Sequence, residues 1–114
     1  MSIRLMKLFL ELREEYWDRD LPIIDVEFYL QEDYGEYHFP HSKEEDTPSS
    51  YKIKIKKYLR QDQLIDTLKH EMAHHYVFVN NKKLVWNNQI YMHGKLWRQE
   101  MRRIGFTGKI TKTT

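Results

Sequence analysis

The run HEMAH at residues 70–74 constrains this chain more than any other feature of its sequence. It lies within residues 61–79, which are predicted to form one long helix because their apolar side chains recur at helical spacing. Residues four positions apart lie one turn from each other on the same side of a helix, so His70 and His74 can reach one metal ion. The opposite side is predicted to face the core and carries Leu64, Leu68, Met72 and Val79.

Glu71 lies about 100° from His70 around the helix, beside a bound metal rather than coordinated to it. From there it could act as a general base and accept a proton from a metal-activated water. H-E-x-x-H on a helix is typical of zinc peptidases, in which three protein ligands leave one zinc position open. The sequence therefore predicts a zinc ion held by His70, His74 and a third ligand.

The third ligand must come from another part of the chain. Val77 stands where the metzincin pattern H-E-x-x-H-x-x-G-x-x-H requires glycine, which excludes that arrangement. A last helix, predicted at residues 93–104, offers two candidates, His93 and Glu100. His93 is favoured because it begins an apolar stripe that faces the core, and Glu100 is the alternative. The stripe continues through Trp97, Met101 and Ile104.

The remaining patterns predict an α+β fold. The expected elements are a helix at 3–17, strands at 25–30, 36–39 and 51–58, the long helix at 61–79 and the last helix at 93–104. Pro22 ends the first helix, because the residue before a proline avoids helical geometry. Polar loops are expected at 40–50 and 80–92, and Gly105 is expected to end the last helix.

The length of 114 residues predicts a single domain spanning 1–114, with residues 106–114 as a frayed tail. Cysteine is absent, which excludes disulfide bonds and any zinc site built on thiolates. The first residues lack the pattern of a signal peptide, and no stretch reaches the roughly 20 apolar residues of a membrane span. We therefore expect a cytoplasmic protein without a membrane partner.

Charge is distributed unevenly along the chain. Residues 1–50 have five Lys or Arg against 13 Asp or Glu, whereas residues 51–114 have 14 against four. The two halves could neutralise each other in the fold, or the basic half could face a polyanion such as DNA. On the last helix, Lys95, Arg98 and Arg102 are predicted to form a basic face that could contact phosphates. A solvated helix surface explains the same pattern.

Three further histidines and two tyrosines are candidate site residues. His75 falls on the apolar side of the long helix and is expected to be packed or hydrogen-bonded there. His38 and His41 could hold a second metal, although a plain surface loop is the simpler interpretation. Tyr76 and Tyr91 could by residue type stabilise an oxyanion, but both are expected to be packing residues.

Two segments resemble the SprT-like family, which includes the Spartan proteases. They are HEMAHHYVFVNN, from residue 70, and HGKLWRQEMRRIGFTG, from residue 93. In that family H-E-x-x-H is followed by a histidine–glycine pair, and then by an aromatic residue and a methionine at helical spacing. His93-Gly94, Trp97 and Met101 match this pattern position by position. The cysteine-rich zinc ribbon of many members has no counterpart in this sequence.

The resemblance implies a zincin-like α+β fold with an N-terminal helix, a small three-stranded sheet, an active-site helix and a C-terminal ligand-bearing helix. It also implies zinc as the cofactor, with His70, His74 and His93 as ligands and Glu71 as the catalytic residue. In eukaryotic relatives the substrates are proteins crosslinked to DNA. We therefore expect a zinc endopeptidase acting on protein or peptide substrates, with DNA as a further partner to be tested. The alternative is a zinc-bound interaction module that contacts nucleic acid through its basic half without proteolysis.

A peptide substrate could bind by adding a strand to an edge of the sheet, which we place along Tyr51–Tyr58. The lysines of this strand have an equally good structural explanation, because charged side chains discourage edge-to-edge aggregation. They are Lys52, Lys54 and Lys56.

Overall fold

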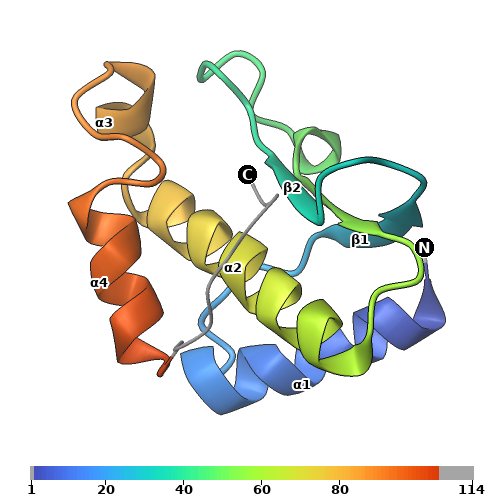
Figure 1. The fold of residues 1–114 in the computed structure, drawn as a ribbon. Coiled ribbons are helices and arrows are strands. Elements are labelled where there is room, and N and C mark those ends of the chain that lie inside the picture. Colours follow the sequence, from blue (N-terminus) through green and yellow to red (C-terminus); the bar gives the residue numbers. More distant parts are fainter. Residues whose placement is uncertain (1, 106–114) are drawn as a thin grey trace.

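The computed structural model describes residues 2–105, and the predicted frayed tail at 106–114 lies outside the described residues. Residues 2–105 form four α-helices and three strands (Figure 1), which confirms the predicted α+β class. In chain order the elements are α1 (Ile3–Trp17), β1 (Asp25–Tyr29), β2 (Gly35–His38), a 3-10 turn (Pro48–Ser50), β3 (Lys52–Lys56), α2 (Gln61–Asn80), α3 (Lys82–Trp86) and α4 (Lys95–Arg103). None of the helices formed by residues 2–105 combines the length and the apolar character that a membrane span requires.

α1 begins and ends where the sequence predicts. The Ser2 hydroxyl caps it by accepting a hydrogen bond from the Leu5 N–H (3.3 Å). Asp18 adopts a left-handed backbone conformation (φ 51°) and its N–H returns to the Arg13 carbonyl, so the helix stops ahead of the proline. One face of the helix enters the core through Leu5, Phe9, Leu12 and Trp17.

β3 lies at the centre of the sheet, parallel to β1 and antiparallel to β2. Its Ile53 and Ile55 are fully buried, whereas its lysines lie on the outer face, as the alternating pattern predicts. On that outer face the Lys52 ammonium lies 3.7 Å from a carboxylate oxygen of Asp25 in β1. The acidic and basic halves of the chain thus meet across the sheet.

The central position of β3 corrects the expectation of a substrate-binding edge along Tyr51–Tyr58. Both sides of β3 are occupied, by β1 and β2, and these two strands form the edges of the sheet. An alternating pattern identifies which residues of a strand face the core. It does not identify the neighbouring strands, because several strand orders would bury the same two isoleucines.

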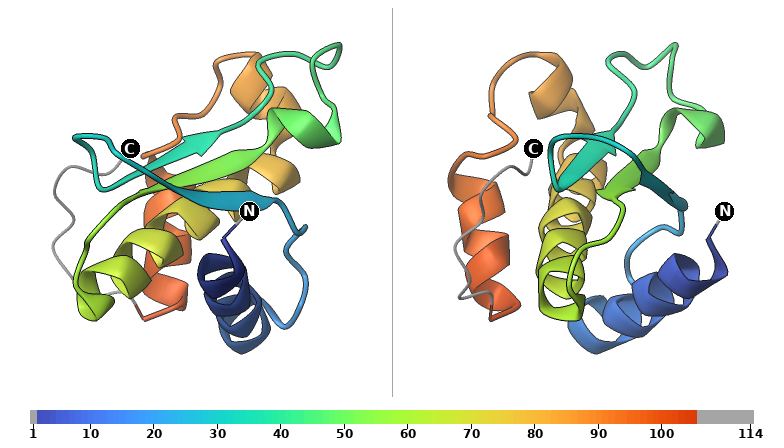
Figure 2. Two further views of the ribbon diagram at one scale, coloured as in Figure 1. Left: turned by 90° about the vertical axis from the view of Figure 1, so that its right-hand side faces the viewer. Right: turned by 45° about the vertical axis from the view of Figure 1, so that its right-hand side comes forward.

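α2 passes through the middle of the molecule, with the sheet on one side and α4 on the other (Figure 2). At its first turn the Gln63 side chain accepts a hydrogen bond from the Arg60 main-chain N–H (3.0 Å). The predicted core face is confirmed, since Leu64, Leu68 and Met72 are buried and Val79 is half-buried against the core. The helix thereby presents its other side, which carries the metal motif, to α4 and to the segment before it.

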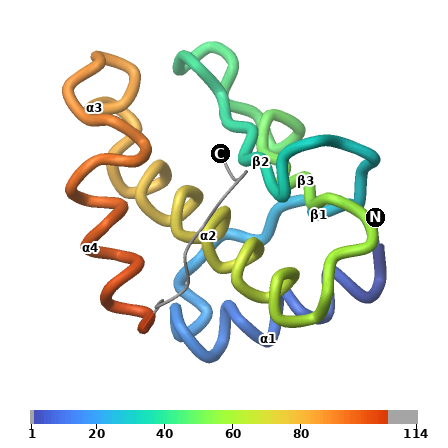
Figure 3. Tube along the Cα trace, in the orientation of Figure 1, coloured from blue at the N-terminus to red at the C-terminus, as the bar shows by residue number. Residues whose placement is uncertain are grey.

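The segment 80–92 is not the plain loop that the sequence predicts, because α3 forms within it. The Trp86 indole N–H donates to the Pro40 carbonyl (2.8 Å), and the Lys82 ammonium pairs with Asp46 (2.8 Å). These two bonds join α3 to the connection between β2 and β3, near the C-terminal end of α2 (Figure 3). A helix of five residues is too short for its periodicity to be recognised in the sequence.

His75 is fully buried and hydrogen-bonded, as expected. Burial lowers its pKa to about 4, so the ring is neutral at pH 7. Its Nε2–H donates to the Pro22 carbonyl (2.9 Å), which leaves Nδ1 to accept a hydrogen bond from the Tyr37 hydroxyl (2.7 Å). The ring therefore connects α2 both to β2 and to the segment that follows α1.

We predict that Tyr37→Phe lowers the free energy of unfolding by about 1–2 kcal/mol, because the buried His75 Nδ1 loses its donor. Urea denaturation of the two proteins measures this difference. Tyr58→Phe is the matched control. Tyr58 is 91% exposed, so loss of its hydroxyl should not change the free energy of unfolding measurably. Equal stability of the two variants would contradict the assigned bond.

Candidate metal centre

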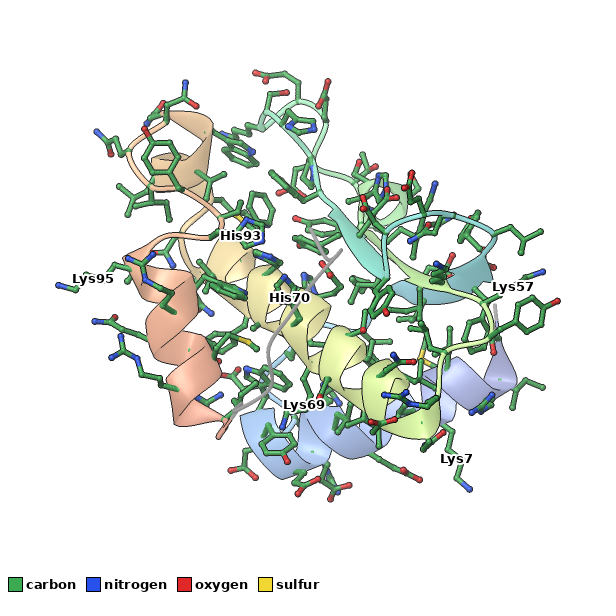
Figure 4. The ribbon with its side chains drawn as sticks, in the orientation of Figure 1. Lys7, Lys57, Lys69, His70, His93 and Lys95 are labelled. Carbon is green, nitrogen blue, oxygen red and sulfur yellow. The ribbon has the colours of Figure 1, made fainter. Side chains whose placement is uncertain are left out.

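Three imidazoles converge on the side of α2 that faces α4. The Nε2 atom of His74 lies 3.1 Å from that of His70 and 3.0 Å from that of His93. One ligand nitrogen from each histidine lies within 4.8 Å of the other two. Figure 4 shows His93 beside α2 and close to His70, although the two residues are distant in sequence.

His93 reaches the site from outside the last helix, which corrects the predicted helix start. α4 begins at Lys95, with Gly94 in an extended conformation as its N-cap. The Gly94 N–H donates to the Tyr91 carbonyl (3.0 Å) and closes a turn there. His93 is thus held by the turn that leads into α4. The rest of the predicted stripe is confirmed as core-facing, since Met101 and Ile104 are buried.

The environment keeps the His74 and His93 imidazoles neutral. His70 and His74 are each 2% exposed, whereas His93 is exposed. Burial, reinforced by the neighbouring His70 and His93, lowers the pKa of His74 to about 2, and partial burial also lowers the pKa of His93. A neutral imidazole retains the nitrogen lone pair that a metal ion requires.

The three residues fit a metal ion better than they fit one another. Each contact between two Nε2 atoms can hold at most one proton, whereas a metal ion can accept a lone pair from every imidazole. A tetrahedral ion with bonds of about 2.0–2.1 Å would place the nitrogens about 3.4 Å apart, a few tenths of an ångström beyond the distances from His74 to His70 and to His93. These histidines could therefore hold a metal ion, and imidazole ligands suit zinc as well as copper, iron or nickel.

Glu71 lies beside the histidines with its carboxyl group enclosed. The side chain is fully buried, and neither carboxylate oxygen has a hydrogen-bond partner among residues 2–105. Its Oε2 lies 3.9 Å from the His70 Nε2. Burial raises the pKa of Glu71 well above its usual range, and the nearby Glu36 and Asp33 add to the effect. A buried carboxyl without a partner is costly, so this group also points to an occupant of the site.

Trp97 packs against all three histidines. Its indole lies nearly parallel to the His74 ring, with an interplanar angle of 16° and a centroid distance of 5.2 Å. It meets the His70 and His93 rings at steeper angles, with centroid distances of 4.7 and 5.2 Å. One aromatic side chain from α4 therefore limits the orientation of every imidazole in the cluster.

Glu100, the alternative third ligand, does not join the histidines. Its carboxylate accepts a hydrogen bond from the Trp17 indole N–H (2.6 Å) and two from the Arg103 guanidinium (2.7 and 2.8 Å). These bonds use the buried Glu100 to hold α4 against the end of α1. The structure therefore brings His93, and not Glu100, to His70 and His74.

The other candidates have no place in the cluster. Tyr76 packs beside Trp17, with a centroid distance of 6.4 Å, and is a packing residue as expected. Tyr91 is 83% exposed, so the expectation that it packs is wrong. His38 and His41 belong to no group that could hold a second metal within the described part of the chain.

Sequence reasoning missed one residue beside the site. Gly35, interpreted from the sequence as turn punctuation, begins β2 and lies directly against Thr67 and Glu71 of α2. The only signal in the sequence is a single glycine ahead of a short strand, which does not reveal the helix that the strand will cover.

We predict that His93→Ala lowers the zinc content of the protein far more than Glu100→Ala, because it removes one of three converging nitrogens. Metal analysis after dialysis against a fixed low concentration of zinc measures both. Glu100→Ala should instead lower the free energy of unfolding, since Trp17 and Arg103 lose their partner. The reverse order of zinc loss would assign the third ligand to Glu100.

The chain was also compared with known proteins. A model of the SprT-like family matches residues 5–114. The curated proteins and the solved structures contain no match to this chain. The family match covers nearly the whole chain and includes Glu71 together with the three histidines of the cluster. The chain therefore belongs to the SprT-like family.

Proposed function

We propose that this protein is a zinc-dependent endopeptidase with a zincin-like active site. The observation that carries the proposal is the placement of a buried, unpartnered Glu71 carboxyl 3.9 Å from one of three converging imidazoles. A purely structural metal site would need the histidines but not this acid. Membership of the SprT-like family, which is associated with zinc metallopeptidases, supports the same assignment.

In this proposal His70, His74 and His93 hold the metal, and Glu71 moves the proton. A bound zinc ion would lower the pKa of a water molecule and polarise the carbonyl of the scissile peptide. Glu71 would accept the proton of the attacking water on its Oε2 and deliver it to the departing amine. Its enclosure raises its basicity, because burial disfavours the charged carboxylate. Trp97 would keep the imidazoles oriented while the charge of the reacting groups changes.

The edge of the sheet formed by β2 is the proposed binding place for a peptide substrate. β2 packs against α2, whereas the other edge strand, β1, packs against α1. The Lys56 N–H donates to the Tyr34 carbonyl (2.8 Å), so in the alternating antiparallel pattern Glu36 and His38 also direct their main-chain groups toward β3. Tyr37, which lies between these two residues, directs its main-chain groups outward, where an extended peptide could pair with them.

We predict that Glu71→Gln lowers kcat by a factor of about 10²–10⁴ and leaves the zinc content unchanged, because the amide cannot accept a proton. Cleavage of an unstructured protein substrate, followed by gel analysis and normalised to bound zinc, measures the effect. Glu11→Gln, on the exposed surface of α1, is the control for loss of one carboxylate. Retention of cleavage by Glu71→Gln would show that the general base is another group.

We also propose that the substrates include DNA-associated proteins. Lys95, Arg98 and Arg102 are exposed on α4, which begins two residues after His93, so a bound polyanion would lie near the metal centre. The competing assignment is an interaction module that binds zinc and nucleic acid without proteolysis. The two differ in whether a bound DNA strand promotes cleavage.

We predict that single-stranded DNA accelerates cleavage of a DNA-binding protein several-fold, and that Arg98→Ala/Arg102→Ala removes most of this acceleration. Lys7→Ala/Lys57→Ala is the charge-matched control, because Figure 4 places these lysines at the other end of the molecule from Lys95. If DNA does not change the rate of cleavage, the protein is a peptidase whose choice of substrate does not depend on DNA. DNA binding without cleavage by the zinc-loaded protein would favour the interaction module.

A further inference from the structure

Gly35 lies where a side chain would collide with the catalytic end of Glu71. It pairs with Ile55 across the sheet, on the face that packs against α2. A Cβ atom at this position would lie 2.7 Å from the Thr67 Cγ2, 2.8 Å from the Glu71 Oε2 and 3.0 Å from the Glu71 Cγ. Ordinary carbon contacts are about 3.5–4.0 Å, so even one methyl group does not fit.

The need for glycine at this position is steric. Among the glycines of residues 2–105, Gly105 is the one with a positive φ, so the backbone of Gly35 is in a region that any residue can adopt. What excludes a larger residue is the close approach of β2 to α2. Such an approach in a strand marks a place where another group comes near the backbone.

The atom that limits the space is the one that the proposed mechanism uses. Oε2 of Glu71 is both the oxygen nearest to the His70 Nε2, at 3.9 Å, and the oxygen that a Cβ at Gly35 would meet. Glu71 is 0% exposed, so its carboxyl cannot swing into solvent to escape the contact. A side chain added at Gly35 would therefore displace the Glu71 carboxylate and change its distance from the metal centre.

β2 is held too firmly to move away instead. Its four residues pair with β3. Two positions beyond Gly35, the Tyr37 hydroxyl is bonded to the buried His75, and the Tyr37 ring stacks on Phe39 with an interplanar angle of 20°. The pairing with β3 and the contacts of Tyr37 hold the strand in place over α2, so the side chains of α2 must absorb an added methyl group.

We infer that Gly35 is a positioning residue for catalysis: because it lacks a side chain, β2 can lie directly over Glu71 and hold its Oε2 at the reacting distance from the metal centre. This inference rests on the proposed function, since it assigns Gly35 a role through the general base. It also explains why the strand proposed to pair with substrate and the proposed base lie in contact.

The test compares Gly35→Ala with the wild-type protein, both loaded with zinc. Gly35→Ala should lower kcat roughly 10- to 100-fold, the scale of a misplacement of about 1 Å in a catalytic group. KM and zinc content should stay within about twofold, because the histidines and the edge of β2 remain in place. A kcat within twofold of the wild-type value at equal zinc content would overturn the inference.

Two further variants separate positioning from a loss of stability. Gly35→Ala/Thr67→Ser removes the contact with the Thr67 Cγ2 but keeps the contacts with Glu71. The double variant should therefore recover thermal stability that Gly35→Ala loses, while kcat stays low. Recovery of kcat in this double variant would show that strand displacement, and not the carboxyl group, caused the defect. Ile55→Val, which shortens the residue opposite Gly35, is the control: it should lower stability and leave kcat per folded molecule unchanged.

A readout without substrate distinguishes this inference from the proposed function. Acetohydroxamic acid chelates a metal through two oxygens and transfers its N–OH proton to a nearby base, so its affinity reports the position of Glu71. Calorimetry on the zinc-loaded proteins should give at least a tenfold weaker Kd for both Gly35→Ala and Glu71→Gln than for wild type. Weaker binding by both variants would support the role of Gly35 even if the wild-type protein cleaves no substrate. Unchanged binding by Gly35→Ala alone would reject it.

Discussion

Helix α2 is enclosed on every side between Thr67 and His75, and this stretch contains the ionisable residues Lys69, His70, Glu71, His74 and His75. Burying such groups without partners would destabilise a small domain by several kcal/mol. The fold provides partners for two of them. The Lys69 ammonium lies 4.3 Å from the centre of the Tyr16 ring, and His75 is hydrogen-bonded through both nitrogens. The Glu71 carboxyl has no hydrogen-bond partner among residues 2–105, and it lies beside His70 and His74, which with His93 could hold a metal ion.

The elements around α2 enclose its buried ionisable groups and place side chains against them. The sheet covers one side of α2 and brings Gly35 against Glu71, while α4 covers another side and brings Trp97 against the imidazoles. Glu100 and Arg103 fasten α4 to Trp17 at the end of α1. The contacts of Glu100 that hold α4 against α1 are thus separate from the groups proposed to carry out chemistry. Substitutions can be designed that change one set and leave the other intact.

Much of this arrangement follows from local sequence patterns. Apolar spacing located α1 and α2 to within a residue or so, and alternation located the three strands, because each pattern reports a single face that must be buried. The H-E-x-x-H spacing indicated two of the clustered histidines, and the stripe on the last helix favoured His93. What local patterns do not encode is how separate segments meet. The central position of β3, the formation of α3 and the contact of Gly35 with Glu71 all depend on tertiary packing.

The location of His93 outside α4 has a consequence for the stability of the C-terminal segments. His74 and His93 are 19 positions apart, and α3 lies between them. An ion shared by these residues would close that stretch into a ring, and so reduce the conformational freedom of the unfolded chain, as a disulfide bond does. In a chain without cysteine, the metal would be its crosslink. Loss of the ion would then loosen the stretch that contains α3 first, because Glu100 and the buried Met101 would still hold α4 against the rest of the fold.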